Sequence, residues 1–483
     1  MKIDKTKFFV ALFFVGVFLL FFLTPMGPDL GWHLRCGEMF WQTGSFCSTN
    51  TFSVLLSGYS WPNHAWGFQA FLYPIYQFGG FFGLSLINSI IVTLSFLLLY
   101  FSIKDKNKKW EKILIIGISI IFSFEVFSLG FRSQILGILF FAIEIFILLR
   151  SQEREKLLYF IPLLFLVWAN FHGSVIVGIV LFGFFLFRRV VFENKNWVKN
   201  GSLFLFSIIA PIINPFGLQI YFDAWKHFAV VDLSKLIAEW TPPGFWVSFF
   251  IVIFAILFLY LCFRKKSLGN AFYSLLILGF LYSALKARRN VILYFLILFF
   301  VYFSLHKEDP FNGFFEHKKL RNLFFVLISL FFVIVLIFSI PINLKSDFNY
   351  NSWCQKSVER NLNYPCSAAQ FMENKTPGNV FNDYEWGGFL IWKIPQDKIF
   401  VDGRMPTWST PQKKSPYTIY LETIQTKPGW QETLDRHNFT YLLIGSGTFM
   451  DLELQRNHSS EGFKEIYRDS ISAIWERINS STS

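Results

Sequence analysis

The sequence has 483 residues, of which 53% are hydrophobic and 16% charged, and its formal net charge at pH 7 is +12. A water-soluble fold of this length does not need so apolar a composition, and the apolar residues come in continuous runs rather than at amphipathic spacing. The sequence contains no Walker loop, no dinucleotide-type glycine motif and no zinc-spaced cysteine cluster, so it supports neither ATP-driven transport nor nicotinamide chemistry, and no nucleotide cofactor is expected.

The apolar runs predict transmembrane helices. Runs such as Phe8 to Leu23 and Trp246 to Phe263 have the length of about 16 to 20 residues that crosses a hydrocarbon core about 30 Å thick. We therefore predict an α-helical polytopic membrane protein with about eleven spans. They lie near 8–23, 82–103, 113–131, 133–149, 157–171, 174–187, 201–214, 245–263, 270–285, 290–305 and 323–341. No small-residue cleavage site follows Leu23, so the first helix is predicted to be an uncleaved anchor rather than a secretory signal.

The distribution of Lys and Arg predicts the orientation. Roughly 22 of the 44 basic residues fall in alternate segments between the spans. These segments are Met1 to Lys7, Lys104 to Lys112, Arg150 to Lys156, Arg188 to Lys199, Arg264 to Lys266 and Lys307 to Arg321. The positive-inside rule then places the amino terminus in the cytoplasm and everything after about Ile342 outside, in a bacterial cytoplasmic membrane. Anionic membrane lipid explains these charges, so nucleic acid is not an expected partner.

Two domains are predicted. Residues 1–341 form the membrane domain, with outside loops at 27–65 and 214–245. Residues 66–78 are apolar but only about 13 residues long and contain Pro74, so they are predicted to form an interfacial helix. Residues 342–483 have ordinary soluble composition and are predicted to be a small extracytoplasmic α/β domain. Its strand-like pieces include Val380-Phe381, Phe389 to Trp392, Lys398 to Val401 and Tyr441 to Ile444, and Gly429 to His437 is helix-like.

The cysteines agree with this topology. Four of the 5 cysteines, Cys36, Cys47, Cys354 and Cys366, fall on segments assigned to the outside, in two pairs about a dozen residues apart. Two local disulfides, Cys36–Cys47 and Cys354–Cys366, would suit an oxidising compartment. Four free thiols in a reducing host are the alternative.

The first outside loop opens with the string PDLGWHLRCGE, which contains Asp29, His33, Arg35 and Glu38. A carboxylate at the membrane surface can deprotonate or orient an acceptor hydroxyl while a nearby cation holds a phosphate. The alternative role of Asp29 is to cap a helix that begins at Leu30. Further along, His64 lies between two aromatic residues in WPNHAW, where a belt of interfacial aromatic residues is the simpler interpretation.

Other polar residues converge on the predicted outer face of the membrane. Substrate-binding candidates there are Asn170, His172 and Glu239, and phosphate-binding candidates are Arg132, Lys286, Arg288 and Arg289. The KARRN cluster breaks the positive-inside bias, and a bound phosphate or diphosphate would account for it; a misassigned hairpin is the alternative. Arg132 has the alternative role of pairing with Glu125. In the tail, Asp402 and Arg404 form either a simple turn or a contact with substrate or with the first loop.

The strings PDLGWHLRCGE, WPNHAW, WANFHG, NPFG, EWTPP, KARRN and NDYEWGGFLIW with VDGR resemble a set of uncharacterised bacterial membrane proteins placed near the GT-C superfamily of polyprenyl-phosphate-sugar-dependent glycosyltransferases. In that superfamily a first-loop acid binds or deprotonates the acceptor, and basic residues on outer loops hold the donor phosphate. The resemblance gives Asp29 the first role and Arg132, Arg288 and Arg289 the second. Many GT-C enzymes have two acids one residue apart in this loop, whereas Leu30 and Gly31 follow Asp29 here and Glu38 is too distant, so a metal requirement is undecided.

The leading hypothesis is a membrane glycosyltransferase with Asp29 as its catalytic acid. Its partners would be membrane lipid, a polyprenyl-phosphate sugar donor and an extracytoplasmic acceptor. A transporter or flippase for a lipid-linked or anionic solute would share the basic cluster, but such proteins usually carry inverted repeats, and none is visible in the sequence. An inactive scaffold that binds lipid or a cell-envelope polymer is the third possibility.

Overall fold

The computed structural model describes residues 5–105, 107–229, 237–264, 267–305, 348–411, 414–457 and 461–478. The predicted span 323–341 and the basic segment Lys307 to Arg321 lie outside these residues. The chain divides into a helical unit (Met1–Pro25, Phe82–Trp225 and Asp232–Asp347) and a mixed unit (Met26–Phe81, Lys226–Val231 and Phe348–Ser483). The predicted domain boundary after residue 341 also falls outside the described residues and stays a prediction.

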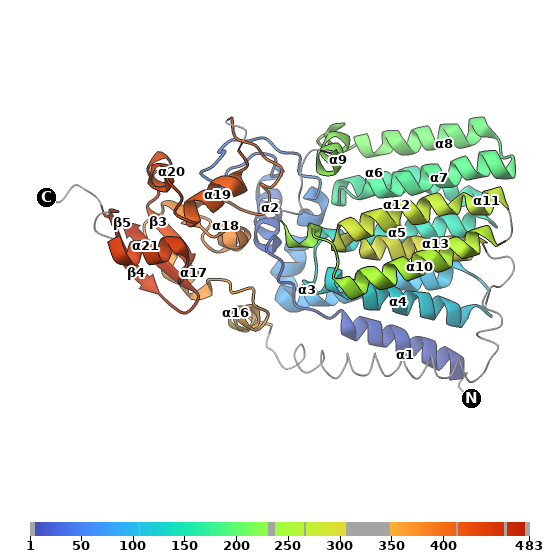
Figure 1. The fold of residues 1–483 in the computed structure, drawn as a ribbon, viewed down its shortest axis with the longest axis horizontal. Coiled ribbons are helices and arrows are strands. Elements are labelled where there is room, and N and C mark those ends of the chain that lie inside the picture. The colour runs from blue at the N-terminus through green and yellow to red at the C-terminus, as the bar shows by residue number, and fades with distance from the viewer. Residues whose placement is uncertain are drawn as a thin grey trace. The chain divides into compact units, whose positions relative to one another are not determined.

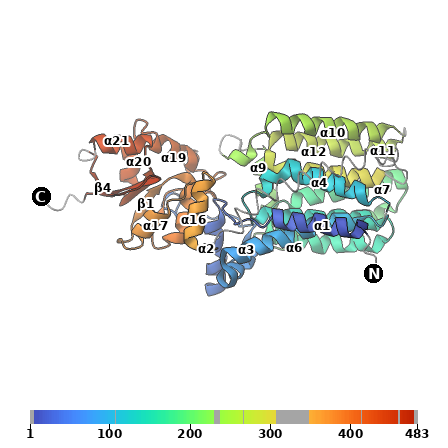
Figure 2. The same ribbon diagram turned by 90° about the horizontal axis from the view of Figure 1, so that it is seen from below.

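The helical unit consists of elongated apolar helices that run side by side (Figures 1 and 2). Each predicted span that falls in the described residues coincides with a helix. Six helices of that part of the chain are long and apolar enough to cross a membrane, so the count of about eleven spans stays a prediction. The helices are α1 (Lys5–Leu20), the second half of α3 (Trp66–Ser102), α4 (Lys109–Phe127), α5 (Ser133–Ser151), α6 (Ile161–Phe171), α7 (Val175–Glu193), α8 (Trp197–Ile209), α9 (Gln219–Ala229), α10 (Phe245–Phe263), α11 (Leu268–Ala271), α12 (Tyr273–Lys286) and α13 (Val291–Leu305). Short 3-10 turns lie at Glu155–Phe160 (η1), Ala210–Ile212 (η2), Ala238–Trp240 (η4) and Arg288–Asn290 (η5).

Helix α3 joins the predicted interfacial segment 66–78 to the predicted span 82–103. It is one helix with a kink at Gly80, whose φ of 55° and ψ of −149° are not helical. Glycine adopts this conformation because it has no Cβ. Pro74 lies inside the first half of α3 without ending it, so the prediction that Pro74 interrupts the segment is wrong, and the break comes at Gly80 instead.

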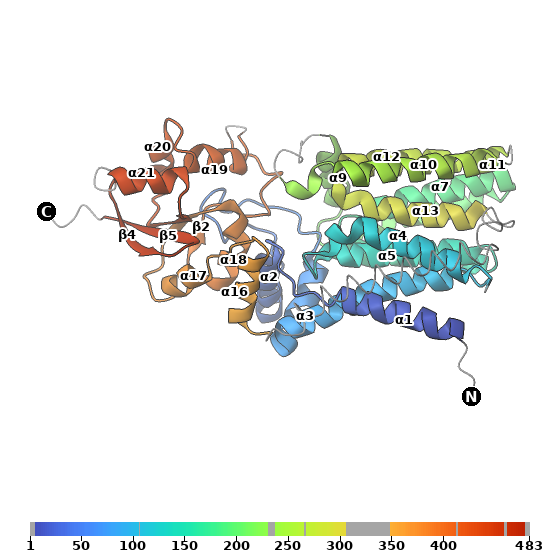
Figure 3. The ribbon, with the colours of Figure 1, turned by 60° about the horizontal axis from the view of Figure 1, so that its bottom comes forward.

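The mixed unit contains a five-stranded sheet in the order β2-β1-β3-β5-β4. Strand β1 (Asn379–Asn382) is parallel to β2 (Lys398–Ile399) and β3 (Tyr441–Gly445), whereas β5 (Ser472–Arg477) is antiparallel to β3 and β4 (Phe463–Arg468). Figure 3 shows helices on both sides of this sheet. The helices of the unit are α2 (Leu30–Thr43), the first half of α3, α16 (Tyr350–Glu359), α17 (Cys366–Met372), η6 (Tyr384–Trp386), α18 (Gly387–Lys393), α19 (Pro416–Ile424), α20 (Trp430–Arg436) and α21 (Phe449–Asn457).

Most tail elements confirm the sequence-based prediction, with one exception. Val380-Phe381, Lys398-Ile399 and Tyr441 to Ile444 lie in strands, and most of Gly429 to His437 forms α20. The predicted strand at Phe389 to Trp392 is wrong, because these residues form α18, which packs against α2. A short apolar run fits a buried helix as well as a buried strand, so its periodicity does not decide between them.

The first outside loop is built into the mixed unit. Its residue Val54 donates a backbone hydrogen bond to the Ile399 carbonyl at 2.8 Å, and the Ile399 N–H donates to the Phe52 carbonyl at 3.0 Å. Residues 52–54 therefore continue the sheet beyond β2. The loop and the tail, far apart in the sequence, share one core.

Candidate functional site

Asp29 stands at the N-terminus of α2, where the sequence predicts a helix to begin. Its carboxylate does not cap the helix; instead Oδ1 accepts a hydrogen bond of 2.8 Å from the indole Nε1 of Trp32. The alternative role of Asp29, to cap α2 with its side chain, is therefore wrong. The side chain is half-buried. Asp29 is thus held in a fixed orientation at a partly open position.

The VDGR turn of the tail covers this carboxylate. A Cβ added at Gly403 would lie 2.3 Å from Oδ1 of Asp29, so only a residue without a side chain leaves room for the acid. On the other side, a Cβ at Gly31 would lie 2.1 Å from the carbonyl oxygen of Gly388, and a Cβ at Gly388 would lie 2.1 Å from that of Pro28. The glycines of PDLGW, NDYEWGG and VDGR therefore permit the close approach of three distant motifs around Asp29.

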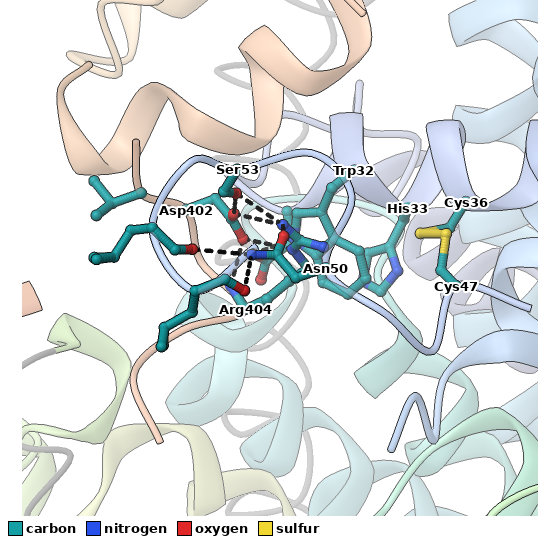
Figure 4. A network of polar contacts seen from close by, with 12 residues as sticks. Trp32, His33, Cys36, Cys47, Asn50, Ser53, Asp402 and Arg404 are labelled. Carbon is teal, nitrogen blue, oxygen red and sulfur yellow. Dashed lines mark hydrogen bonds and ion pairs between the residues drawn. A yellow bond between two sulfur atoms is a disulfide. The ribbon is translucent and has the colours of Figure 1, made fainter. Parts of the chain in front are cut away.

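Asp402 and Arg404 bind the first loop to the tail, which is one of the two alternatives that the sequence leaves open. Arg404 donates to Asp402 through Nε and Nη2, both at 2.7 Å, and Nη2 also reaches Asn50 Oδ1 at 3.0 Å and Ser53 Oγ at 3.2 Å. Ser53 in turn donates to Asp402 at 3.0 Å. Figure 4 shows this network beside Trp32. All four polar residues are buried, so the network joins the first loop to the tail inside the mixed unit.

The remaining first-loop candidates surround α2. His33 is buried, with its ring 3.6 Å from the Trp32 ring and its Nδ1 3.2 Å from Gln69 Nε2. Arg35 pairs with Glu38 at 2.5 Å. His64 is half-buried just before α3. His33 therefore joins the packing around Asp29 through Trp32, while Arg35 and Glu38 neutralise one another one turn further along the helix.

In the helical unit, three of the four predicted cations belong to one group, which we call the arginine cluster: Glu125, Arg132, Glu239, Trp240, Thr241, Arg288 and Arg289. Arg132 forms an ion pair with Glu239, and Arg288 forms one with Glu125. The alternative in which Arg132 pairs with Glu125 is therefore wrong, because η4 and η5 bring a different partner to each arginine. The KARRN segment is a genuine turn, since α12 ends at Lys286 and α13 begins at Val291.

Within the arginine cluster Arg132 and Arg288 each have a second contact, and Arg289 contacts an aromatic ring. Arg132 Nη2 donates to the Val126 carbonyl at 3.0 Å, Arg288 Nη2 donates to Thr241 Oγ1 at 2.8 Å, and the Arg289 guanidinium lies 4.9 Å from the Trp240 ring centre. These contacts fix the planar groups in place, which suits bidentate recognition of an anion.

The other candidates of the helical unit lie apart from the ion pairs of this cluster. Asn170 at the end of α6 donates to the carbonyls of Leu166 and Ile213, at 2.8 and 3.2 Å. His172 Nδ1 lies 2.7 Å from Ser174 Oγ at the start of α7. Lys286 is exposed at the end of α12. Asn170 and His172 therefore shape helix ends.

The sequence reasoning missed Asp383, in the NDYEWGG string. Its Oδ2 accepts from the Gly445 N–H at 2.9 Å and its Oδ1 from the Tyr420 hydroxyl at 3.2 Å. Burial raises the pKa of Asp383 to about 6, although both hydrogen bonds act in the opposite direction. The acidic residue at a strand end was visible in the sequence, but its burial was not.

Over the part of the chain that the structure describes, no group of three or more His, Cys, Asp or Glu side chains is arranged to hold a metal ion. The donors around Asp29 therefore do not by themselves complete a protein-held metal site.

No protein-family model matches the sequence, and no curated protein matches it. Solved structures do. The archaeal oligosaccharyltransferase AglB from Archaeoglobus fulgidus, in complex with an inhibitory peptide and a dolichol-phosphate, matches with a TM-score of 0.63 at 10% identity over 100% of this chain and 75% of its own. ArnT from Cupriavidus metallidurans bound to undecaprenyl phosphate matches with a TM-score of 0.53 at 10% identity over 99% of each chain. At this identity the likeness establishes the fold alone: the chain shares the fold of these two solved proteins.

Proposed function

We propose that this protein is a membrane glycosyltransferase that moves a sugar from a polyprenyl-phosphate donor to an extracytoplasmic acceptor. The observation that carries the proposal is the placement of Asp29. The acid stands at a helix start without capping it, Trp32 orients it, and Gly403 leaves room for it. A carboxylate whose orientation is fixed in this way can orient or deprotonate an acceptor hydroxyl.

The arginine cluster supports the donor side of the proposal. Arg132, Arg288 and Arg289 all interact electrostatically with Glu239, and Arg288 also forms an ion pair with Glu125. A phosphate adds charge-assisted hydrogen bonds to arginines that are already oriented, which lowers the entropic cost of binding it. The solved relatives in fold were bound to dolichol-phosphate and undecaprenyl phosphate, lipids of the same chemical class.

The Asp29→Asn variant tests the proposal. In membranes that contain the full-length protein, transfer of radiolabelled sugar from a panel of polyprenyl-phosphate sugars should fall by about 10² to 10⁴-fold, because the amide cannot accept the proton. Asp435→Asn is the matched control, since Asp435 is an exposed carboxylate of the same unit whose partner is Arg477. Transfer that survives in Asp29→Asn would overturn the role of this acid. A parallel arm with EDTA measures the metal requirement directly.

Trp32→Phe tests whether the hydrogen bond that orients the Asp29 carboxylate contributes to catalysis. The variant keeps a ring against His33 but removes the N–H that holds Asp29. We expect kcat to fall by about tenfold, the order of one hydrogen bond, with little change in the KM for donor. An unchanged kcat would show that Trp32 does not position the acid.

Arg288→Gln tests the donor side. This variant should raise the KM for the polyprenyl-phosphate sugar by about tenfold or more while the protein stays folded, because a charge-assisted contact to phosphate is lost. Lys195→Gln, which removes an exposed cation elsewhere in the helical unit, is the control. An equal effect of both variants would point to general electrostatics rather than to a phosphate site.

A further inference from the structure

A second cluster of cations surrounds a large cavity in the helical unit. The cavity has a volume of about 1020 Å³ and is walled by α1, α3, α4 and α5. It lies at the end of the unit where α1 begins and α3 ends, on the right of Figure 1. Five basic side chains line it: Lys7, Lys104, Lys109, Lys112 and Arg150. We call this cavity the basic pocket. None of its residues belongs to the arginine cluster.

The ammonium of Lys112 is the most informative feature of the basic pocket. The residue is only 3% exposed, its Nζ donates to the Ile103 carbonyl at 2.9 Å, and the ammonium lies 4.5 Å from the Tyr100 ring centre. Asp105 and Glu111 attract it electrostatically and Arg150 repels it, but no ion pair in the described part of the chain joins Lys112 to a carboxylate. Burying a charge is costly unless an opposite charge accompanies it. An anion in the basic pocket would meet this requirement.

Carboxylates at the rim only partly balance the other cations. Glu153 forms an ion pair with Lys104 and lies 4.0 Å from Arg150 Nη1. The side chain of Glu153 is half exposed, so water weakens both interactions. The Arg150 Nη2 donates to the Phe101 carbonyl at 2.6 Å, which holds the guanidinium at the cavity. The lining of the basic pocket itself contains five basic side chains and no carboxylate.

The remaining wall of the basic pocket is apolar. Val10, Ala11 and Phe14 of α1 face Leu97 and Phe101 of α3 across it. A free inorganic anion gains nothing from such a wall, whereas a lipid can place its phosphate among the cations and lay its chains along the apolar side. A volume of about 1020 Å³ is at the upper end of small-molecule sites and accommodates a headgroup with its glycerol.

We propose that the basic pocket binds the phosphate-bearing headgroup of an anionic phospholipid. Lys112 and Arg150 contact the phosphate at the base of the pocket, and Lys7, Lys104 and Lys109 neutralise it from the rim. This site would tie α1 to α3, α4 and α5 and is separate from the donor phosphate, so it does not depend on the proposed activity.

Lipid titration of the delipidated full-length protein tests the proposal, with bound lipid counted by native mass spectrometry. The probes are phosphatidylglycerol, phosphatidylcholine and inorganic phosphate. Phosphatidylglycerol should bind at least about fivefold more tightly than phosphatidylcholine. The double variant Lys104→Gln with Lys109→Gln should bind phosphatidylglycerol more weakly, by about fivefold for each cation removed. This is the effect expected of a cation at a lipid headgroup. Lys195→Gln, outside the basic pocket, should leave its affinity unchanged.

The outcomes separate the explanations. Equal affinity for the two lipids would overturn the proposal. So would an equal loss of phosphatidylglycerol affinity in the double variant and in Lys195→Gln. Inorganic phosphate that displaces phosphatidylglycerol stoichiometrically at millimolar concentration would show a free-anion site and overturn the lipid assignment. Lys112→Gln is the second variant: if it is folded by circular dichroism, unchanged phosphatidylglycerol binding would overturn the role of Lys112. The double variant at the exposed rim decides the proposal if Lys112→Gln does not fold.

Discussion

Arg404 and Asp402, two residues apart in the VDGR turn, form a buried ion pair in which the guanidinium also reaches Asn50 and Ser53 of the first outside loop. The aromatic rings of Phe52 and Trp408 lie 5.0 and 5.5 Å from the same guanidinium. A turn that looks like a local steric feature in the sequence is therefore the attachment point of a segment about 350 residues away. This attachment keeps Gly403 over Asp29.

Arg404→Ala should destabilise the mixed unit by about 3 to 5 kcal/mol, because it leaves the Asp402 carboxylate buried without its cation. Hydrogen exchange in the full-length protein should show lost protection first in residues 48–60, which the guanidinium holds. Lys464→Ala is the control: it breaks an exposed ion pair with Glu476 and should cost no more than about 1 kcal/mol. Equal effects of the two variants would show that the ion pair does not anchor the loop.

The contact between α2 and α18 predicts a second effect. Gly31→Ala would place a Cβ 2.1 Å from the Gly388 carbonyl oxygen, so the two helices must separate, and we expect a loss of about 1 to 3 kcal/mol or more. Gly79→Ala, in α3 of the same unit, meets nothing within 4 Å and should be neutral or stabilising by up to about 1 kcal/mol. Thermal unfolding of both variants measures the difference, and a Gly31→Ala protein as stable as Gly79→Ala would contradict the close approach.

The sequence predicts those features that depend on local chemistry. Apolar run length locates the helices, Leu30 begins α2 as expected, and KARRN forms a turn between α12 and α13. The cysteine spacing correctly anticipates both disulfides. These features follow from hydrophobic length, backbone freedom and chain separation, which are properties of a few neighbouring residues.

Ion-pair and packing partners that are far apart in the sequence could not be predicted from it. Arg132 pairs with Glu239 rather than with nearby Glu125, because the path of the loop before α10 decides which carboxylate arrives. Likewise, nothing in the alternation of NDYEWGGFLIW distinguishes a buried strand from the helix α18, whose burial comes from α2. The roles of Asp29, the arginine cluster and the other site residues stay predictions, since geometry alone does not show chemistry.

The disulfides predict an effect of reduction. Cys36–Cys47 and Cys354–Cys366 close loops with sequence separations of 11 and 12, so loss of either should cost about 2 to 3 kcal/mol. Alkylation of the denatured protein under non-reducing conditions should label Cys262 alone among the 5 cysteines, all of which the structure describes, with mass spectrometry as the readout. The double variant Cys36→Ser with Cys47→Ser should unfold at lower temperature than wild type, whereas Cys262→Ala should keep both disulfides. Labelling of all five positions would establish free thiols.

Asp383 predicts a pH dependence. Its pKa is raised from 3.8 to about 6 by burial, so between these values the folded state binds more protons than the unfolded state. The contribution of Asp383 to stability is therefore fully present below about pH 4 and is lost as the pH rises through about 6. Because the side chain is half-buried, solvent screening limits this loss to about 1 to 2 kcal/mol.

Asp383→Asn isolates that contribution, since an amide keeps the shape and polarity of the protonated acid at every pH. Hydrogen exchange of β3, compared between the two proteins at each pH, should show the Asn variant gaining about 1 to 2 kcal/mol relative to wild type between pH 4 and 7.5. Tyr420→Phe removes a hydrogen bond that lowers the pKa of Asp383, so it should move the transition to higher pH. A difference between wild type and Asp383→Asn that does not change with pH would mean that Asp383 titrates alike in both states, and would contradict the raised pKa.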